Sequence, residues 1–207
     1  MRAAAVGLLA ASLAACGPAR HAATAPAPSA DRSDPVAARV RADSLRRPYT
    51  DADIRFMSHM IAHHAQAVLI AGWAPSHGAG PAILRLAERI ASAQQDEIDI
   101  LRQWLGDRGR AAPATGHSMP MPGMLAGVQL RELDAARGQA FDRLFLTSMI
   151  QHHRGAVAMV RDLFATPGAG RDETVFKFAN DVSADQSTEI ARMEAMLATY
   201  TTGTRSP

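Results

Sequence analysis

The sequence predicts an all-α protein, a four-helix bundle built from two repeated helical hairpins. Hydrophobic residues make up 47% of the 207 residues and aromatic residues only 5%. An alanine-rich chain with few β-branched runs favours packed helices over sheet. Residues 56–68 return as residues 145–157 at a constant offset and without a gap. Two copies of a helical unit that cannot bury its apolar face alone predict a packed pair.

The chain begins with the features of a bacterial export signal. Arg2 precedes an apolar stretch over residues 3–15, and Leu13-Ala14-Ala15-Cys16 resembles a lipobox. We expect residues 1–15 to be a lipoprotein signal peptide and Cys16 to carry a lipid anchor. The protein would then be exported and held on a bacterial membrane, facing the periplasm or the outside. The alternative is a plain signal peptide with an incidental cysteine. Cys16 is the only cysteine, so we expect no disulfide in the mature domain.

Residues 16–47 connect this anchor to the helical domain, which we expect over residues 48–202. The first part is rich in Ala, Pro and Ser and is typical of a flexible tether. Asp34-Pro35 resembles an N-cap followed by the first residue of a helix, so a short helix over 35–47 is possible on this pattern. The structural core is therefore predicted to begin near Thr50, which together with Asp51 offers an N-cap.

The first hairpin is expected over about 51–106. Its first helix runs from Asp51 to Trp73, and glycines and prolines from 72 to 81 end it and form the turn. The second helix runs from Pro81 to Leu105. A linker over 107–127 alternates Pro and Gly too closely for helix or strand.

The second hairpin is expected over about 128–200 and repeats the order of the first. A short helix over 128–137 precedes a long helix from Gln139 to Phe164. Pro167-Gly168-Ala169-Gly170 repeats the turn, and a last helix covers Asp172 to Thr199.

Each long helix carries a polar pair inside its apolar stripe. The four pairs are Met60/His63, Gln94/Glu97, Met149/His152 and Gln186/Glu189. The members of each pair are three residues apart and project from one side of a helix. Buried imidazoles and carboxylates need partners. Either they form a hydrogen-bond network that fixes helix pairing, or they bind a metal with Glu97 and Glu189 orienting the histidines.

The donor types select the metal. The repeated Met-Ile-x-His-His motif includes His64 and His153 beside the stripe histidines. Thioether plus imidazole without thiolate suits Cu(I) or Ag(I), and imidazole also accepts Cu(II). Zinc sites rarely use Met, and di-iron bundles need Glu where this motif has Met. We expect acid to protonate the imidazoles below about pH 6 and weaken such a site.

The linker supplies a second set of soft donors, namely His117, Met119, Met121 and Met124. A Met-rich loop can wrap a soft ion or can simply fill a gap in the bundle. His59 and Met57 lie one helical step from the stripe and could extend the first site. His77 in a turn and His21 in the tether are expected to be ordinary surface residues.

These motifs resemble the domain of unknown function 305 family. The matching motifs are Phe56-Met57-x-x-Met60-Ile61-x-His63-His64, Gln94-x-x-Glu97-Ile98, Met121-Pro122-Gly123-Met124, Phe141-Asp142-x-x-Phe145-Leu146-x-x-Met149-Ile150-x-His152-His153-x-Gly155-Ala156 and Gln186-x-x-Glu189-Ile190. The resemblance covers roughly residues 51–197. It implies a ferritin-like four-helix bundle, export from a bacterial cell, and copper or silver binding at these Met and His positions. It implies no reaction.

Three functions therefore remain open at this stage. The first is an extracytoplasmic copper or silver binding protein that acts as buffer, scavenger or chaperone, with an unidentified protein giving or taking the metal. The second is a ferritin-like di-metal redox enzyme, and the third is a structural bundle with a buried polar network. The net charge is +2 and the basic residues are scattered among acids, so no basic patch indicates a nucleic-acid partner.

Overall fold

The structure is a computed structural model that describes residues 49–113 and 120–202 and the single positions 39 and 42. Within these residues every regular element is a helix, which confirms the all-α prediction. The helices are α2 (Asp51–Trp73), α3 (Pro81–Gly106), α4 (Gly127–Ala135), α5 (Gly138–Ala165) and α6 (Glu173–Thr202). The predicted signal peptide, Cys16, His21, His117 and Met119 lie outside the described residues, as does the 35–47 segment apart from Arg39 and Ala42, which are helical.

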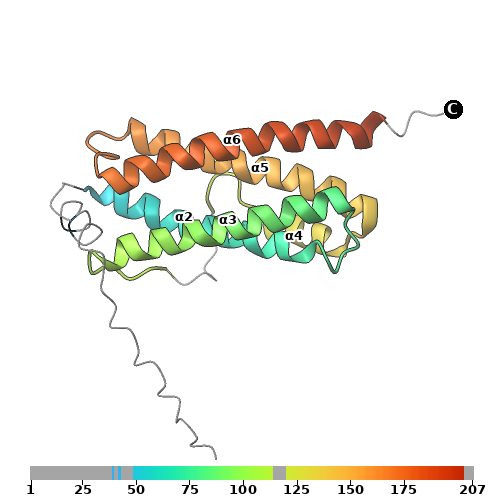
Figure 1. Ribbon diagram of the computed structural model, residues 1–207, viewed down its shortest axis with the longest axis horizontal. Coiled ribbons are helices and arrows are strands. Elements are labelled where there is room, and N and C mark those ends of the chain that lie inside the picture. Colours follow the sequence, from blue (N-terminus) through green and yellow to red (C-terminus); the bar gives the residue numbers. More distant parts are fainter. Residues whose placement is uncertain (1–38, 40–41, 43–48, 114–119, 203–207) are drawn as a thin grey trace, which may run out of the picture.

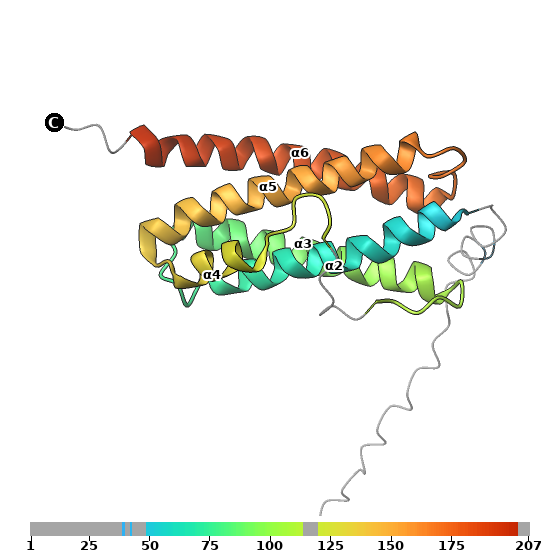
Figure 2. The same ribbon diagram turned by 180° about the vertical axis from the view of Figure 1, so that it is seen from behind.

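Four long helices lie side by side, with α4 along one flank (Figure 1). α2 packs along α3, α5 packs along α6, and the two hairpins meet chiefly through α2 and α5. Residues 121–125, in the loop that precedes α4, arch over the junction of α2 and α5 (Figure 2). No described helix combines the length and apolarity that a membrane crossing requires.

Helix ends follow local chemistry closely. Thr50 caps α2 through a capping box, in which Thr50 Oγ1 accepts from the Asp53 N–H at 3.2 Å and Asp53 Oδ2 accepts from the Thr50 N–H at 2.7 Å. Pro81 stands at the start of α3, where its missing N–H costs nothing. Only Ala136 and Arg137 separate α4 from Gly138, which opens α5 with a φ of 56°. A glycine tolerates this left-handed conformation and lets the second helix begin after so short a connection.

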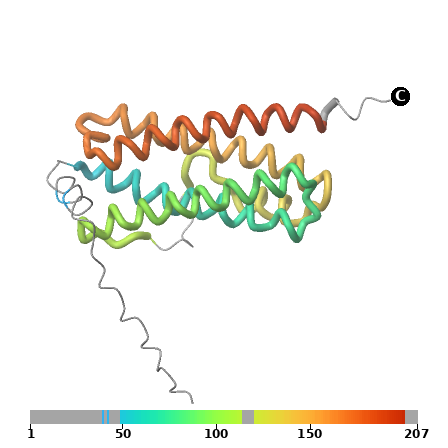
Figure 3. Tube along the Cα trace, in the orientation of Figure 1, coloured from blue at the N-terminus to red at the C-terminus, as the bar shows by residue number. Residues whose placement is uncertain are grey.

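Two aspartates at equivalent places of the repeat tie the hairpins together. Asp53 Oδ1 accepts a hydrogen bond of 2.7 Å from the N–H of Gly170, in the α5–α6 turn. Asp142 accepts from the N–H of Gly80, in the α2–α3 turn, at 3.1 Å. Each hairpin therefore anchors the turn of the other. Figure 3 shows each turn beside the start of the partner hairpin's first helix. This exchange explains why the aspartate recurs with the motif.

His77 corrects the expectation of a surface histidine. Its side chain is 4% exposed and stacks on Trp73 at a ring distance of 5.9 Å. Its Nε2 lies 3.0 Å from the Asp134 carbonyl oxygen, and its own carbonyl accepts from the Gly138 N–H at 2.8 Å. His77 thus joins the α2–α3 turn to the α4–α5 junction. We expected exposure because residue 77 lies in a turn, and the sequence of a turn does not reveal that another helix covers it.

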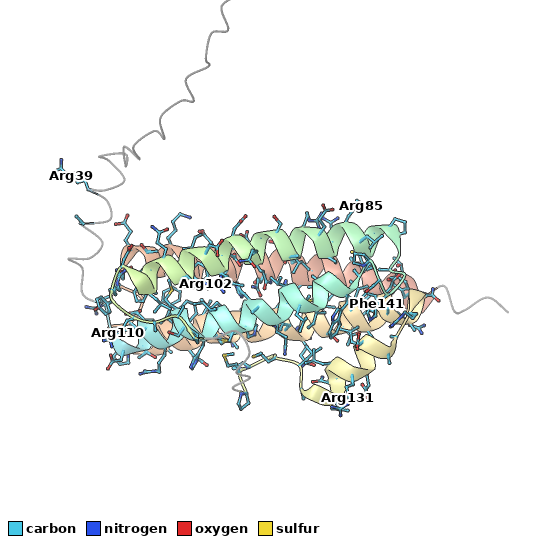
Figure 4. The ribbon with its side chains drawn as sticks, turned by 90° about the horizontal axis from the view of Figure 1, so that it is seen from below. Arg39, Arg85, Arg102, Arg110, Arg131 and Phe141 are labelled. Atoms are coloured by element: carbon cyan, nitrogen blue, oxygen red, sulfur yellow. The ribbon has the colours of Figure 1, made fainter. Side chains whose placement is uncertain are left out.

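The apolar core is divided into two clusters. One surrounds Phe141 and Phe145 at the α2–α3 turn end, and the other surrounds Phe56 and Phe178 at the α5–α6 turn end. Figure 4 shows Phe141 inside the molecule, whereas Arg85 and Arg131 project from the outer faces of their helices. Two adjacent-histidine pairs, on α2 and α5, lie in sequence between the residues of these clusters.

Candidate metal-binding site

Four fully buried histidines form the centre of the molecule. His63 and His64 come from α2, and His152 and His153 come from α5. Their helical spacing places each doublet between apolar residues one turn before and after it. The rings of His63 and His152 are 3.9 Å apart between centroids, and His152 Nε2 donates to the carbonyl oxygen of His63 at 3.0 Å. The structure therefore brings the two halves of the repeat together at these imidazoles.

The predicted carboxylates reach the second histidine of each doublet. His153 Nε2 lies 2.7 Å from Glu189 Oε2, within hydrogen-bond geometry. His64 Nε2 lies 2.8 Å from Glu97 Oε2, at an angle outside hydrogen-bond geometry. Both glutamates remain partly exposed while the histidines are buried. Glu97 and Glu189 therefore lie against His64 and His153, whereas His63 and His152 are held by backbone carbonyls.

The second ring nitrogens form the most unusual feature of this site. In the described part of the chain, Nδ1 of all four histidines is buried without a hydrogen-bond partner. The side-chain amides of Gln94 and Gln186 are also buried without partners. Because Nε2 of His63, His152 and His153 faces an oxygen acceptor, Nε2 carries the proton and Nδ1 holds a free lone pair. A buried polar atom left without a hydrogen bond costs about 1–3 kcal/mol. These buried imidazole nitrogens and amides are therefore expected to have a bound partner.

Burial keeps the inner imidazoles neutral. Loss of solvation, together with the neighbouring His64, lowers the pKa of His63 from 6.5 to about 3. Desolvation, and next the neighbouring His63, lowers the pKa of His152 well below its usual value. The expectation that acid protonates the imidazoles below about pH 6 is therefore wrong for His63 and His152 in the folded protein. Neutral imidazoles with free lone pairs are the form that binds metal ions.

Methionine thioethers precede the histidines of both doublets in the sequence. Met57, Met60 and Met149 are fully buried. Met57 and Met60 belong to the cluster around Phe56, and Met149 belongs to the cluster around Phe141. Among the described residues, no three His, Asp or Glu side chains converge as a ready metal-binding group. Any ion bound here would therefore draw on histidine pairs supplemented by other donors.

The Met-Pro-Gly-Met segment closes the site from the outside. The carbonyl oxygen of Pro122 accepts from His63 Nε2 at 3.0 Å. Gln66 holds the end of this segment through both backbone polar groups of Leu125. Its Nε2 donates to the Leu125 carbonyl at 3.1 Å, and its Oε1 accepts from the Leu125 N–H at 2.8 Å. Met121 and Met124 are half-buried. This loop is thus a fixed part of the structure over the residues described.

Gly155 explains how the loop comes so close to α5. A Cβ atom at this position would lie 2.0 Å from the Pro122 carbonyl oxygen and 2.6 Å from the Gly123 Cα. Only glycine leaves room for backbone at that distance. Gly155 occupies the place in the second repeat that Gln66 occupies in the first. Sequence reasoning placed both residues in the repeated motif but gave neither a role, and the signal that could have found the role is this difference between otherwise similar repeats.

Known proteins resemble the helical part of this chain, which contains the buried histidines. The model of the family described as Domain of unknown function (DUF305) matches residues 53–197. A DUF305 fragment from Deinococcus radiodurans is 27% identical, with a TM-score of 0.65 over 73% of this chain and 99% of that chain. A DUF305 protein from Streptomyces coelicolor, described as a candidate secreted protein, is 25% identical, with a TM-score of 0.64 over 72% and 93%.

A third similar structure carries a metal in its description. CopM in the Cu(I)-bound form is 28% identical to this chain, with a TM-score of 0.58 over 74% of this chain and 99% of that one. CopM has also been solved in Cu(II)-bound and Ag-bound forms. No curated protein matches the sequence.

Proposed function

This chain belongs to the DUF305 family, and from that premise we propose that it binds copper or silver ions outside the cytoplasm. Its role would be that of a buffer, scavenger or chaperone in metal tolerance. The structural relative CopM is described with Cu(I), Cu(II) and Ag, and the donor set of this chain suits the same ions. An imidazole and thioether site without thiolate favours Cu(I) and Ag(I), and imidazole alone also accepts Cu(II).

The four unpartnered Nδ1 atoms carry this proposal. On His63, His152 and His153 this atom is a buried acceptor, because Nε2 faces an oxygen acceptor, and within the described residues no hydrogen-bond partner reaches any of the four. The partner that a group of buried acceptors lacks must be a proton donor or a cation. Protonation of His63 is opposed by burial, which lowers its pKa to about 3. A soft cation satisfies the lone pairs without adding a desolvated proton charge to each ring.

The proposal assigns roles to the residues. His63, His64, His152 and His153 supply imidazole nitrogens, and their carbonyl or carboxylate partners fix which nitrogen is free. Met57, Met60 and Met149 supply thioethers from the neighbouring apolar clusters. Met121 and Met124, with His117 and Met119 of the same loop, are proposed as further soft donors. Glu97 and Glu189 orient histidines and need not touch the ion.

The glutamates also bear on the enzymatic alternative. A di-metal redox centre of the ferritin type draws carboxylates directly onto the metals. Here Glu97 Oε2 and Glu189 Oε2 lie 2.8 and 2.7 Å from histidine nitrogens. Their position favours carriage of an ion over turnover, and a purely structural network would leave the Nδ1 atoms unexplained.

The direct test replaces His63 and His152 by glutamine. The Nε2 of glutamine can reproduce the histidine Nε2–H bond to a backbone carbonyl, while the Nδ1 lone pair is lost. We expect the tighter copper site to disappear from titrations of Cu(I) and Cu(II) against a competing chelator. Gln94→Leu with Gln186→Leu is the matched control, since it changes buried polar atoms of the same group and keeps every imidazole. Binding equal to wild type in the glutamine variant would make the histidines a packing network.

Location and anchoring complete the proposal. The resemblance to a candidate secreted protein supports export, and the Leu13-Ala14-Ala15-Cys16 motif supports a lipid on Cys16. Cys16→Ser should move the protein from the membrane fraction to the soluble fraction. Unchanged fractionation would exclude the lipid anchor without affecting the metal site.

The pairing of α2 with α3 and of α5 with α6 supports a ferritin-like four-helix bundle of two hairpins over residues 48–202. A crystal structure with a different pairing of the long helices would overturn it.

A further inference from the structure

A second group of soft donors lies outside the buried histidines. A pocket with a volume of about 220 Å³ opens to solvent between α2, α5 and the Met-Pro-Gly-Met loop. Among its lining residues are one imidazole and two thioethers, from His59, Met121 and Met159. Each comes from a different one of these three segments. Arg55 and Asp162 also line the pocket, so their opposite charges largely offset each other.

The donors are buried to different degrees. Met159 is 8% exposed, and His59 and Met121 are half-buried. Methionine in such a place commonly fills an irregular gap. An apolar filling, however, gives no reason for an imidazole in the same wall. Imidazole and thioether together are the donor set that suits Cu(I) and Ag(I).

Duplication does not account for these donors. The buried histidines and aspartates recur at matching positions of both repeats. His59 corresponds to Ser148 in the second repeat, and Met159 corresponds to Ile70 in the first. The two exceptional donors lie on the same side of the molecule, the side that the Met-Pro-Gly-Met loop covers. The imidazole of His59 and the thioether of Met159 are thus not repeated at the equivalent positions of the other hairpin.

The loop holds Met121 in place. The Met124 N–H donates to the Met121 carbonyl at 3.2 Å, which closes a turn around Gly123. Gln66 grips the other end of this turn through Leu125. Close contact of Pro122 and Gly123 with Gly155 fixes the middle. A donor on a fixed loop needs little further ordering when an ion binds.

We infer that His59, Met121 and Met159 form a second, solvent-accessible site for Cu(I) or Ag(I), which receives ions before the buried histidines do. The inference rests on the proposed function for the class of ion. Pro122 connects the outer pocket with the buried histidines, because it lines the pocket and its carbonyl oxygen accepts from His63 Nε2 at 3.0 Å. An ion in the pocket is separated from His63 by this one residue of the loop.

The test follows the methionine methyl groups of the full chain by NMR during titration with Ag(I). Selective ¹³C-methyl labelling gives one signal for each methionine, and Met121→Leu and Met159→Leu assign the two that matter. Leucine preserves volume and apolar character, so these variants should fold. Met196→Leu is the matched control, since Met196 is a half-buried methionine of α6 that has no proposed metal role and does not line the pocket.

We expect the Met121 and Met159 methyl signals to shift early in the titration. They should shift in wild type and also in the His63→Gln, His152→Gln variant, where the buried site is disabled. Met121→Leu with Met159→Leu, or His59→Asn, should weaken this early binding by roughly tenfold or more, and Met196→Leu should not.

The outcomes separate the two claims. Ag(I) binding in wild type that leaves the Met121 and Met159 signals unmoved would overturn the pocket site and keep the buried histidine site. Early shifts that vanish in the double glutamine variant would also overturn an independent outer site. Absence of any Ag(I) binding to wild type would overturn this inference and the proposed function together.

Discussion

Replacing Gly155 by alanine sets two opposite effects against each other. In the interior of a helix, alanine is more favourable than glycine by about 0.5–1 kcal/mol. The same methyl group would lie 2.0 Å from the Pro122 carbonyl oxygen and 2.4 Å from its carbon. Both atoms are backbone, so no flexible side chain can turn away. The Met-Pro-Gly-Met loop must move off α5 by about 1 Å or more to relieve this contact.

The displaced loop carries several hydrogen bonds with it. His63 Nε2 would lose the Pro122 carbonyl, and Gln66 would lose both bonds to Leu125. At about 1 kcal/mol for each net hydrogen bond, loss of these three contacts costs roughly 3 kcal/mol. The clash therefore outweighs the gain in helix propensity. We expect Gly155→Ala to lower the free energy of unfolding by about 2 kcal/mol.

Urea unfolding of the metal-free protein measures this change, and Gly72→Ala is the matched control. Gly72 lies in α2 and a Cβ atom there would meet nothing within 4 Å, so this variant should gain up to about 1 kcal/mol. The comparison isolates the loop contact, because both variants add the same methyl group to a long helix. If Gly155→Ala were stabilised as much as Gly72→Ala, the loop would not be fixed against α5. The inference that the loop holds Met121 would then fail as well.

Two further predictions concern charge. Because burial lowers the pKa of His63 from 6.5 to about 3, the unfolded chain binds more protons below pH 6.5. The free energy of unfolding should therefore fall as pH drops, by ~2 kcal/mol at pH 5 from His63 alone. Urea midpoints of metal-free wild type and His63→Gln measure it, and equal pH dependence would contradict it. Asp53→Ala should cost about 1–3 kcal/mol or more, because Gly170 N–H loses its 2.7 Å acceptor and the capping box with Thr50 is lost as well. Exposed Asp51→Ala should change the urea midpoint far less.

The helices could be predicted from the sequence because their signals are local. Apolar residues at helical spacing, Thr50 at a cap, and Gly–Pro clusters at turns are all readable without knowledge of the partner helix. α2 has the predicted bounds, and the other helices differ by a few residues at their ends. The repeat added the tertiary information, since it indicated two similar hairpins that need each other.

Partners across the molecule could not be read in this way. The helical spacing in the sequence placed Glu97 and His63 in the apolar stripes of their own helices, which suggested that these two residues meet. In the structure, however, the Glu97 carboxylate lies beside His64. A rotation of neighbouring helices by one residue decides which histidine of a doublet meets the glutamate. His77 was misjudged for a related reason, because α4 covers the turn that contains it. Such contacts depend on helix rotation and on a short connecting helix, neither of which leaves a periodic signal.

Divergence between the two repeats indicates how one face became special. A duplicated hairpin would give equivalent groups on both faces, as the two buried histidine doublets and the two turn-capping aspartates show. The repeat-equivalent residues Gln66 and Gly155, however, differ. The glutamine grips the loop backbone and the glycine makes space for it. These two changes act together, because a loop held by Gln66 would collide with any side chain at residue 155. The loop then brings Met121 to His59 and Met159 on the face that it covers, so the loss of symmetry at two backbone contacts places the third donor of the proposed outer site.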